Sequence, residues 1–597
     1  MERRPSGSEQ ITHGIILLCS LLPLAFFPGL ISLYRLPKSA LLAFFSAVLC
    51  WLWAAGHFRQ KDDGSTLPLL APLLVFLFIA ALSLFRSINP YEGANFLFQT
   101  ILGVSLFWIT STDFETGKLG RFFHWSAIAA GIVSVLGIAQ AGNKNMAAQY
   151  LLFVLPTVFY LLLCSTNPSR EWAYALLAGL ITSYFVYTGT RAAWGGAMVG
   201  LIGVLTCLAL GGRLAKTAWS IPMRKWAFLV GIGAFVITMN VVPPYLFRGF
   251  AAQPPRAQLE SMLEVEAEGR DRFAIWANSL AVFADHPILG TGKGNFRFIY
   301  PVYARRAIED RSFSPQARAA DAHNDYIQLL AETGVLGATS FLLILVFLAL
   351  RFWKGLRQKP DPKLLAIGFA LVAILAEAFW DFPFNLPVPV AFFWIYAGVL
   401  WQLTQTHAPK EHQPLRALSS LTIVLATLVA TLFSILTFSY VRGEFYYSRG
   451  ARESYQGRPE EAEKDLTKAT AISPLNYRYH FLLGLLLIKM KEYGKAADSI
   501  RHSLSLDPYN INALNNLGVA YASAGDTPKA VQAFQTALRI WPRYIEPQKS
   551  LGFIYAREGE REKAIRYFQA VLALDASDRQ ARDSLLALGV IPPGQQR

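Results

Sequence analysis

The stretch from residue 321 to residue 334 carries a histidine, two amides and three carboxylates directly before a long apolar segment. Its polar members are Asp321, His323, Asn324, Asp325, Gln328 and Glu332. If a helix begins near Asp321, the three carboxylates and Gln328 share one face of it. A histidine at the start of such a helix suits a general base, so we predict that His323 is catalytic and that its neighbours support it. The structural alternative is an N-cap network that ties a loop to the next apolar helix.

Arginines form the second candidate group. Arg270 and Arg272 open an amphipathic segment at 269–285, and Arg191 precedes an apolar run in the sequence Thr-Gly-Thr-Arg-Ala-Ala-Trp. The guanidinium presents a fixed fork of donors that binds phosphate oxygens at two points. We therefore predict that these arginines bind phosphate groups, although Arg191 also fits a topological or interfacial role.

Two further polar elements stand at the ends of apolar runs. Lys144 lies in Asn-Lys-Asn at 143–145, and Asp381 begins Asp-Phe-Pro-Phe-Asn at 381–385. Lys144 is a candidate for an anionic ligand and Asp381 for orienting an arginine, and each also has a purely structural interpretation. The glycines of 290–294 alternate around Lys293, but no strand precedes them, so a backbone turn is a better interpretation than a nucleotide loop.

Metal chemistry is not indicated by the sequence. All four cysteines fall in apolar runs, and neither a Cys-x-x-Cys pair nor a histidine and carboxylate spacing typical of metal sites is present. We expect a metal-independent mechanism that needs no cofactor.

The composition indicates a polytopic membrane protein. Of 597 residues, 53% are hydrophobic and only 16% are charged, which is too apolar for a soluble chain of this length. The formal net charge of +15 comes from lysines and arginines that lie mainly in short loops between apolar runs, where they set topology. No basic surface with interleaved aromatic residues is evident, so nucleic acid is excluded as a partner.

Thirteen apolar runs are long enough to cross a bilayer, and we expect 12 or 13 spans. The predicted runs are 13–34, 39–57, 67–85, 95–112, 122–141, 146–164, 172–188, 191–210, 226–245, 335–353, 364–382, 388–405 and 417–440. The predicted domains are the N-terminal spans (1–245), a large loop with the catalytic motifs (246–334), the C-terminal spans (335–440) and a repeat region (443–597). Loop charges place the N-terminus in the cytoplasm, and the large loop and the repeats outside it.

The C-terminal region repeats with a period of 34 residues, from 443, 477, 511 and 545. Its eighth position is always glycine and its twentieth always alanine, at Gly450, Gly484, Gly518, Gly552, Ala462, Ala496, Ala530 and Ala564. This pattern resembles tetratricopeptide repeats. The resemblance implies an α-solenoid that binds a protein or substrate chain, and the fold class of the whole chain is then all-α. The alternative is that the repeats only pack against the membrane domain.

The stretch His-Asn-Asp-Tyr-Ile-Gln-Leu-Leu-Ala-Glu-Thr-Gly-Val-Leu-Gly at 323–337 resembles the signature of the O-antigen ligase and polymerase superfamily. The Arg-x-x-x-Trp of 272–276, followed by His-Pro-x-x-Gly-x-Gly at 286–292, resembles its companion motif, and Arg191 resembles another recurrent arginine. The resemblance implies a glycosyltransferase of the bacterial inner membrane. It would transfer a glycan from undecaprenyl diphosphate, with inversion, to lipid A-core, to another glycan or to a protein outside the cytoplasm.

Several functions remain open at this stage. The same motifs serve ligases, O-antigen or exopolysaccharide polymerases and protein O-oligosaccharyltransferases. A transporter would place ionisable residues deep within several spans, whereas most candidates here lie at one edge and in one loop. A scaffold would depend on its repeats and not on the loop motifs. The positions of the candidates therefore favour the enzyme.

Overall fold

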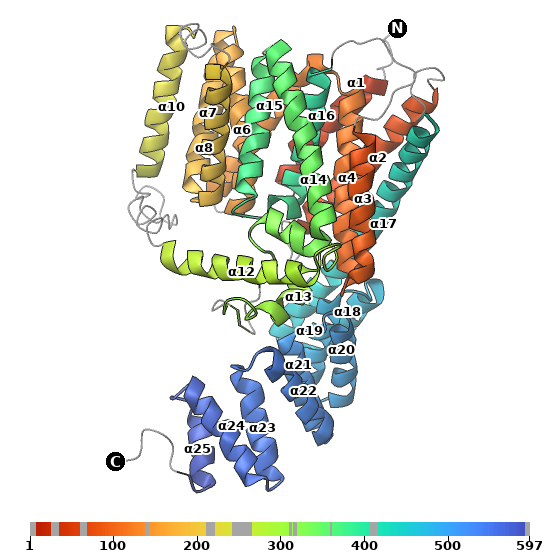
Figure 1. Ribbon diagram of the computed structural model, residues 1–597, viewed down its shortest axis with the longest axis vertical. Coiled ribbons are helices and arrows are strands. Elements are labelled where there is room, and N and C mark those ends of the chain that lie inside the picture. The colour runs from red at the N-terminus through yellow and green to blue at the C-terminus, as the bar shows by residue number, and fades with distance from the viewer. Residues whose placement is uncertain are drawn as a thin grey trace.

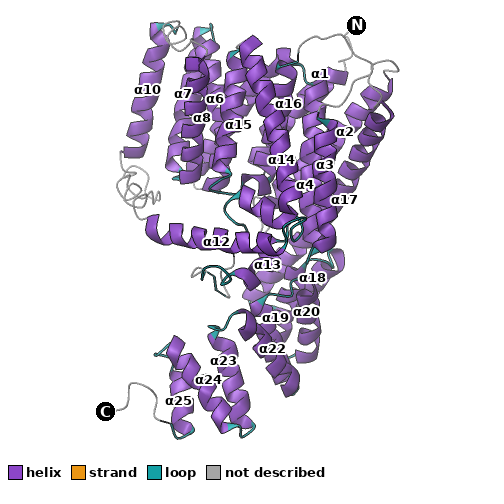
Figure 2. Ribbon diagram, in the orientation of Figure 1, coloured by secondary structure: helices purple, strands orange, loops and turns teal. Residues whose placement is uncertain are grey.

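The chain was analysed as a computed structural model that describes residues 7–25, 35–59, 69–138, 143–210, 221–241, 265–309, 313–314, 319–358, 361–405 and 416–590. Within these ranges the regular structure is helical and no strand occurs (Figure 2). Figure 1 shows a bundle of upright helices, one helix that crosses beneath it, and a curved array of shorter helices that extends away from it. The predicted all-α class is confirmed.

The bundle is formed by two groups of helices that are separated by the large loop. The first group is α1 (Gly7–Leu21), α2 (Arg35–Arg59), α3 (Leu70–Ser83), α4 (Pro90–Asp113), α5 (Leu119–Ile138), α6 (Lys144–Cys164), α7 (Pro168–Tyr187), α8 (Arg191–Leu210) and α10 (Met223–Val241). The second group is α14 (Asp325–Gln358), α15 (Pro362–Glu377), α16 (Pro387–Leu403) and α17 (Arg416–Tyr455). Each predicted apolar run overlaps one of these helices, and residues 26–34, 67–68, 139–141 and 242–245 of the runs lie outside the described ranges.

Seven of the helices in the described ranges are by themselves long and apolar enough to cross a membrane. They include α4, α6 and α14, and two shorter apolar helices accompany them, at Leu70–Arg86 and Pro387–Leu403. Helix α16 lies at the centre of the bundle, since every residue from Pro387 to Leu400 is buried. Its uniformly apolar sequence fits this position, because a helix without a polar face is stable only when it is covered on all sides.

Glycines allow α8 to pack closely on α15. A Cβ atom added at Gly196 would overlap the carbonyl oxygen of Ala373, and one at Gly200 would press on that of Phe369. Two small residues four positions apart let two helix backbones approach in this way. The contact brings the start of α8, which is Arg191, to the end of the bundle where α15 terminates.

The large loop contributes two helices beneath the bundle. Helix α12 (Val265–Asp285) crosses under the lower ends of the bundle helices, and α13 (Phe296–Tyr303) lies between it and the repeat array (Figure 1). An aromatic and aliphatic core joins this loop to the array. It contains Phe296, Tyr300, Phe313 and Ala322 from the loop, and Ile511, Leu514, Trp541 and Tyr544 from the repeats.

The repeat array consists of helix pairs that begin where the period predicts. The pairs are α19 (Tyr477–Lys489) with α20 (Tyr493–Leu506), α21 (Ile511–Ser523) with α22 (Thr527–Ile540), and α23 (Ile545–Arg557) with α24 (Arg561–Leu574), followed by α25 (Arg579–Ala587). The glycine of each repeat faces the second helix of its pair, and a Cβ atom at Gly518 would lie 2.6 Å from the ring of Phe534. The predicted tetratricopeptide fold is confirmed.

The first repeat differs from the prediction in one respect. Its first helix is the end of α17, and its second is α18 (Pro459–Ile472). The predicted division between residues 440 and 443 therefore falls inside one continuous helix. Hydropathy drops at this point, but no proline interrupts the stretch, so the helix continues from the bundle into the array.

Candidate active site

His323 occupies a strained position immediately before α14. Its φ angle is +50°, in the left-handed region that residues other than glycine rarely adopt. Asn324 follows as the N-cap, because its Oδ1 accepts hydrogen bonds from the N–H groups of Tyr326 and Ile327, both at 3.0 Å. The helix therefore begins at Asp325, and the expected start near Asp321 is corrected, since the left-handed turn at His323 separates Asp321 from the helix. Strain of this kind is often concentrated at functional sites.

A buried carboxylate faces the histidine ring. The Nδ1 atom of His323 lies 3.6 Å from Oδ1 of Asp381, and the Phe382 ring packs against the imidazole with centroids 5.2 Å apart. The other oxygen of Asp381 accepts a hydrogen bond of 3.2 Å from Nε2 of Gln149, on α6. Asp381, which was expected beside an arginine, thus lies between Gln149 and His323. A carboxylate at Nδ1 fixes the ring and stabilises the imidazolium that forms when Nε2 takes a proton.

The Arg-x-x-x-Trp motif attaches α12 to this site. Arg272 donates from Nη1 to the carbonyl oxygen of Trp380 at 2.9 Å. One turn further along, Trp276 donates from Nε1 to the carbonyl oxygen of Ala322 at 3.0 Å. The two side chains share a helix face at this spacing. They hold α12 to the residues directly before Asp381 and directly before His323.

The remaining polar groups of the signature tie the loop together and do not face the imidazole. Asp321 accepts a hydrogen bond from the Asn385 side chain, and Asp325 accepts one from the Phe384 N–H. Gln328 accepts from the Ala322 N–H. The hydrogen bonds to Asp321 and Asp325 fix the turn of residues 381–385 against the start of α14. The predicted polar face thus orders the backbone that carries His323 and Asp381.

Glu332 is fully buried and belongs to a separate ion pair. Its Oε2 lies 3.1 Å from Nζ of Lys293, and its Oε1 accepts hydrogen bonds from the Phe296 N–H and from Nε2 of Gln328, both at 3.2 Å. Lys293 stands among the alternating glycines of residues 290–294. Its charge is therefore directed to a buried carboxylate of α14.

Those glycines interlock with a kink in α14. Gly290, Gly292, Gly294 and Gly334 all have positive φ angles. The N–H of Gly292 donates to the Glu332 carbonyl at 2.9 Å, and the N–H of Val335 donates to the Pro287 carbonyl at 2.8 Å. A Cβ atom at Gly334 would overlap the carbonyl oxygen of Ile288. The glycines therefore form a backbone turn, as the sequence analysis favoured.

Lys144 and Arg191 lie at the same end of the bundle as Asp381. Both are exposed and begin helices, and the Thr190 hydroxyl donates to Oδ1 of Asn145 at 3.1 Å, which joins the two helix starts. Lys144 places Nζ 4.6 Å from the centre of the Tyr187 ring. Five residues after Lys144 on α6, Gln149 reaches Asp381. Arg270 is part of α12, but its side chain lies outside the described residues.

Asp285 and His286 form a separate group at the end of α12. Asp285 accepts a hydrogen bond of 2.8 Å from the Tyr303 hydroxyl, and His286 places Nδ1 3.3 Å from Nη2 of Arg86. Burial lowers the pKa of His286 and the Arg86 guanidinium lowers it further. Burial and the bond to Asp285 raise the pKa of Tyr303 to about 12. These groups join the end of α12 to Tyr303 and to Arg86.

Three residues near the site were not identified from the sequence. Gln149 is the clearest, because a buried amide within an apolar helix is costly and marks a specific contact. Phe379 and Trp380 precede Asp381, and aromatic residues at a helix end resemble ordinary interfacial residues in a sequence. Within the described ranges, no group of three or more histidine, cysteine, aspartate or glutamate side chains is arranged to hold a metal.

Residues 155–342 match a family model described as O-Antigen ligase. This range contains Arg191, Arg272 and His323. This part of the membrane domain is therefore similar to the O-antigen ligase family. Two tetratricopeptide repeat models match residues 438–511 and 509–577 of the same chain. The chain thus combines a segment that matches an O-antigen ligase model with C-terminal tetratricopeptide repeats.

Comparison with known proteins adds a few solved structures. A search of curated proteins found no match. A crystal structure of MamA is 22% identical and covers 28% of this chain and 97% of its own, with a TM-score of 0.23. A MamA structure from Desulfovibrio magneticus RS-1 is 25% identical, with coverages of 23% and 77% and a TM-score of 0.22. The first repeat domain of Spaghetti, bound to an HSP90 peptide, is 20% identical, with coverages of 19% and 90% and a TM-score of 0.19.

Proposed function

We propose that this protein is an inverting glycosyltransferase of the bacterial inner membrane. It transfers a glycan from undecaprenyl diphosphate to an acceptor hydroxyl outside the cytoplasm. The observation that carries the proposal is the pairing of His323 with the buried carboxylate of Asp381, 3.6 Å away, at the end of the bundle where Arg272 is fixed to Trp380. The proposed base thus faces Asp381, and the candidate phosphate-binding arginine bonds to the residue directly before Asp381, which supports the proposal.

The reaction is a single displacement. Nε2 of His323 takes the proton of the acceptor hydroxyl, and the acceptor oxygen attacks the anomeric carbon of the first sugar. The bond from that carbon to the diphosphate oxygen breaks, and the diphosphate leaves with the bonding electrons. Arg191, Arg272 and Lys144 bind the diphosphate and neutralise its growing charge, and Arg270 is a further candidate. The bond from Arg272 to Trp380 uses one of the five N–H groups of a guanidinium.

Helix ends add to the electrostatics of this region. Helices α6, α8 and α14 begin at Lys144, Arg191 and Asp325, at the end of the bundle that contains Asp381. The N-terminus of a helix carries partial positive charge and unpaired N–H groups. Several such ends on one side of the bundle favour an anionic ligand there, which supports a diphosphate donor.

Loop charges support the orientation. Basic loops such as 213–225 and 351–363 belong to the cytoplasmic side under the positive-inside rule, which leaves the large loop, the site and the repeat array outside the cytoplasm. The acceptor is then lipid A-core, another glycan chain or a protein at the outer surface. We propose that the repeat array binds a protein partner or the acceptor chain beside the site.

The test is complementation of a deletion strain with variants of the full chain, with surface glycans read on gels and by blot. His323→Ala should abolish the glycoconjugate while the protein stays at wild-type levels in the membrane. His13→Ala is the matched control, because it alters an exposed histidine of α1 that lies outside both motifs. Full complementation by His323→Ala would contradict the proposal. The identity of the lost glycoconjugate distinguishes a ligase or polymerase from a protein transferase.

A further inference from the structure

Two exposed aromatic side chains lie beside the catalytic pair. Phe379 and Trp380 are each 45% exposed. The residues on either side of this pair, in the turn after α15, are buried. Their rings contact each other with centroids 5.2 Å apart. We call these two residues the aromatic platform. Large apolar side chains that stay exposed next to a site commonly mark a binding surface.

The platform is held in place from below. The Trp276 ring lies 5.7 Å from the Phe379 ring and 5.5 Å from the Trp380 ring, measured between centroids. Trp276 is itself bonded to the Ala322 carbonyl, and Arg272 is bonded to the Trp380 carbonyl. The platform is therefore fixed to α12 and to the residue before His323. Its two rings present a surface that needs little reordering when a ligand binds.

The backbone of the platform also connects the two chemical functions of the site. Trp380 accepts the hydrogen bond of Arg272 and is followed directly by Asp381, which faces His323. In the proposed reaction the first sugar must sit between the group that binds the diphosphate and the base that activates the acceptor. A pyranose ring has a face of C–H groups that packs on aromatic faces, while its hydroxyls remain available to polar groups. Aromatic side chains offer such area at low entropic cost.

We propose that Phe379 and Trp380 form the subsite for the first pyranose ring of the lipid-linked donor. This inference rests on the proposed function. The platform positions the anomeric carbon between Arg272 and His323 and does not itself take part in bond making. The competing interpretation is that both rings only anchor the protein at the membrane surface.

The test uses membranes that contain the full-length protein. They are supplied with rising amounts of undecaprenyl-diphosphate-linked glycan, extracted from cells that lack the protein and accumulate this donor. Trp380→Leu keeps an apolar side chain but removes the flat ring, and should raise the half-saturating donor concentration about tenfold with little change in maximal rate. Trp380→Phe should stay within about threefold of wild type. Phe379→Leu should act in the same direction as Trp380→Leu.

Phe85→Leu is the matched control, because Phe85 is 90% exposed, lies in the short turn after α3, and is outside the platform. If Trp380→Leu behaves as wild type while His323→Ala is inactive, the assignment of the platform as a sugar subsite is wrong and the proposed function stands. If His323→Ala is also fully active, the proposed function itself fails. If Trp380→Leu and Phe85→Leu reduce the amount of membrane-inserted protein equally, the aromatic residues act as anchors and the inference is overturned. If only the half-saturating acceptor concentration rises, the assignment to the donor sugar is overturned.

Discussion

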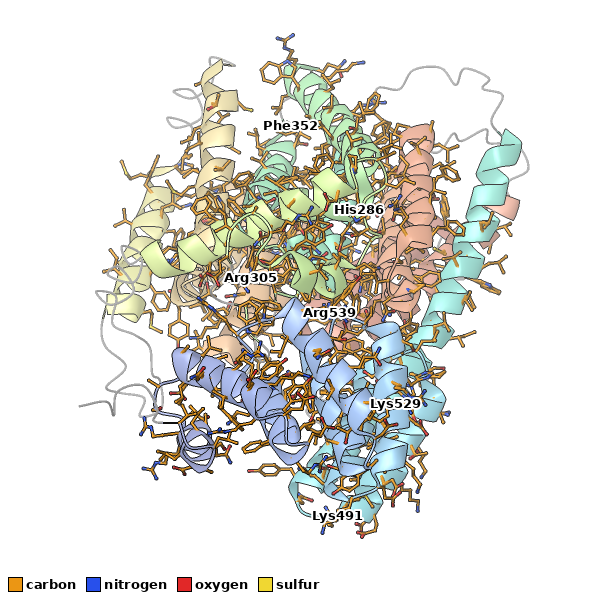
Figure 3. All side chains as sticks on the ribbon, turned by 60° about the horizontal axis from the view of Figure 1, so that its bottom comes forward. His286, Arg305, Phe352, Lys491, Lys529 and Arg539 are labelled. Atoms are coloured by element: carbon orange, nitrogen blue, oxygen red, sulfur yellow. The ribbon has the colours of Figure 1, made fainter. Side chains whose placement is uncertain are left out.

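The ring of Phe313, in the large loop, packs against the ring of Trp541, in the third repeat, with centroids 5.0 Å apart and an interplanar angle of 66°. The same cluster of buried residues includes Ala322, which directly precedes His323. Arg305 of the same loop, labelled in Figure 3, has its guanidinium 5.6 Å from the centre of the Trp541 ring. The array and the loop that carries His323 therefore share one core.

Replacement of Trp541 by alanine should weaken both the array and the reaction. Removing this buried ring from the core of the array should cost about 3 kcal/mol of stability, because large aromatic side chains leave cavities. The loop before His323 would loosen with it, and glycan transfer should fall. Thermal unfolding and transfer assays on the full chain measure the two effects. Leu586→Ala, at an exposed position of α25, is the control. Unchanged transfer in a visibly destabilised Trp541→Ala protein would show that the array does not support the site.

Replacement of Asp381 by asparagine should slow the reaction without preventing folding. The amide keeps the size of the side chain and an acceptor for Gln149, but it removes the negative charge that faces Nδ1 of His323. The maximal rate should fall about tenfold to a hundredfold, and the half-saturating donor concentration should change little. Asp361→Asn, at the N-cap of α15, is the matched control. Equal maximal rates for the two variants would show that the charge of Asp381 does not contribute to the reaction.

Replacement of Gly334 by alanine should break the interlock between the large loop and α14. The φ angle of +64° disfavours alanine, and its Cβ atom would overlap the Ile288 carbonyl oxygen. Together these effects should cost about 3 kcal/mol or more. Gly233→Ala is the comparison, because a Cβ atom there meets nothing within 4 Å and alanine is favoured in a helix. Thermal unfolding in detergent should separate the two variants, and similar melting temperatures would refute the interlock.

Stability of the array should decline in acid through Asp578. Burial alone would raise the pKa of this carboxyl, but the Ala581 N–H and the Lys549 ammonium, 3.0 Å away, hold it below 3.8. A group with a depressed pKa in the folded state stabilises the fold above its unfolded pKa, and this contribution is lost as the pH falls through the folded value. Asp578→Ala should cost about 1 kcal/mol at pH 7 and much less at pH 3. An equal cost at both pH values would exclude this charge as the cause.

Much of the fold could be predicted because its signals are local. The apolar runs and the glycine and alanine positions of the repeats depend only on neighbouring residues, and α19, α21 and α23 begin at the first residues of the predicted repeats. The start of α14 was placed too early, although Asn324 is a common N-cap type and could have been used to find it. The continuity of α17 could not be predicted, because the apolar run and the repeat period mark the two domains separately and neither shows that one helix joins them.

The site could be predicted only in part. His323, Arg272 and Asp381 were identified as candidates, but the contact between His323 and Asp381 depends on how two apolar helices return to one end of the bundle. No local pattern encodes that contact. The same holds for Gln149, which reaches Asp381 from a third helix. The polar residues of 321–332 were predicted to support His323. In the structure the carboxylates Asp321, Asp325 and Glu332 contact neighbouring loops.

The unbroken helix α17 has a mechanical consequence. With 40 residues it is about 60 Å long, and it enters the array without a linker. A helix that spans a bilayer tilts when the bilayer becomes thinner, so a change in tilt of about 10° would displace the far end of α17 by about 10 Å. A change in bilayer thickness would then move the array. Because Trp541 and Phe313 share one core, this movement would also displace the residues that precede His323.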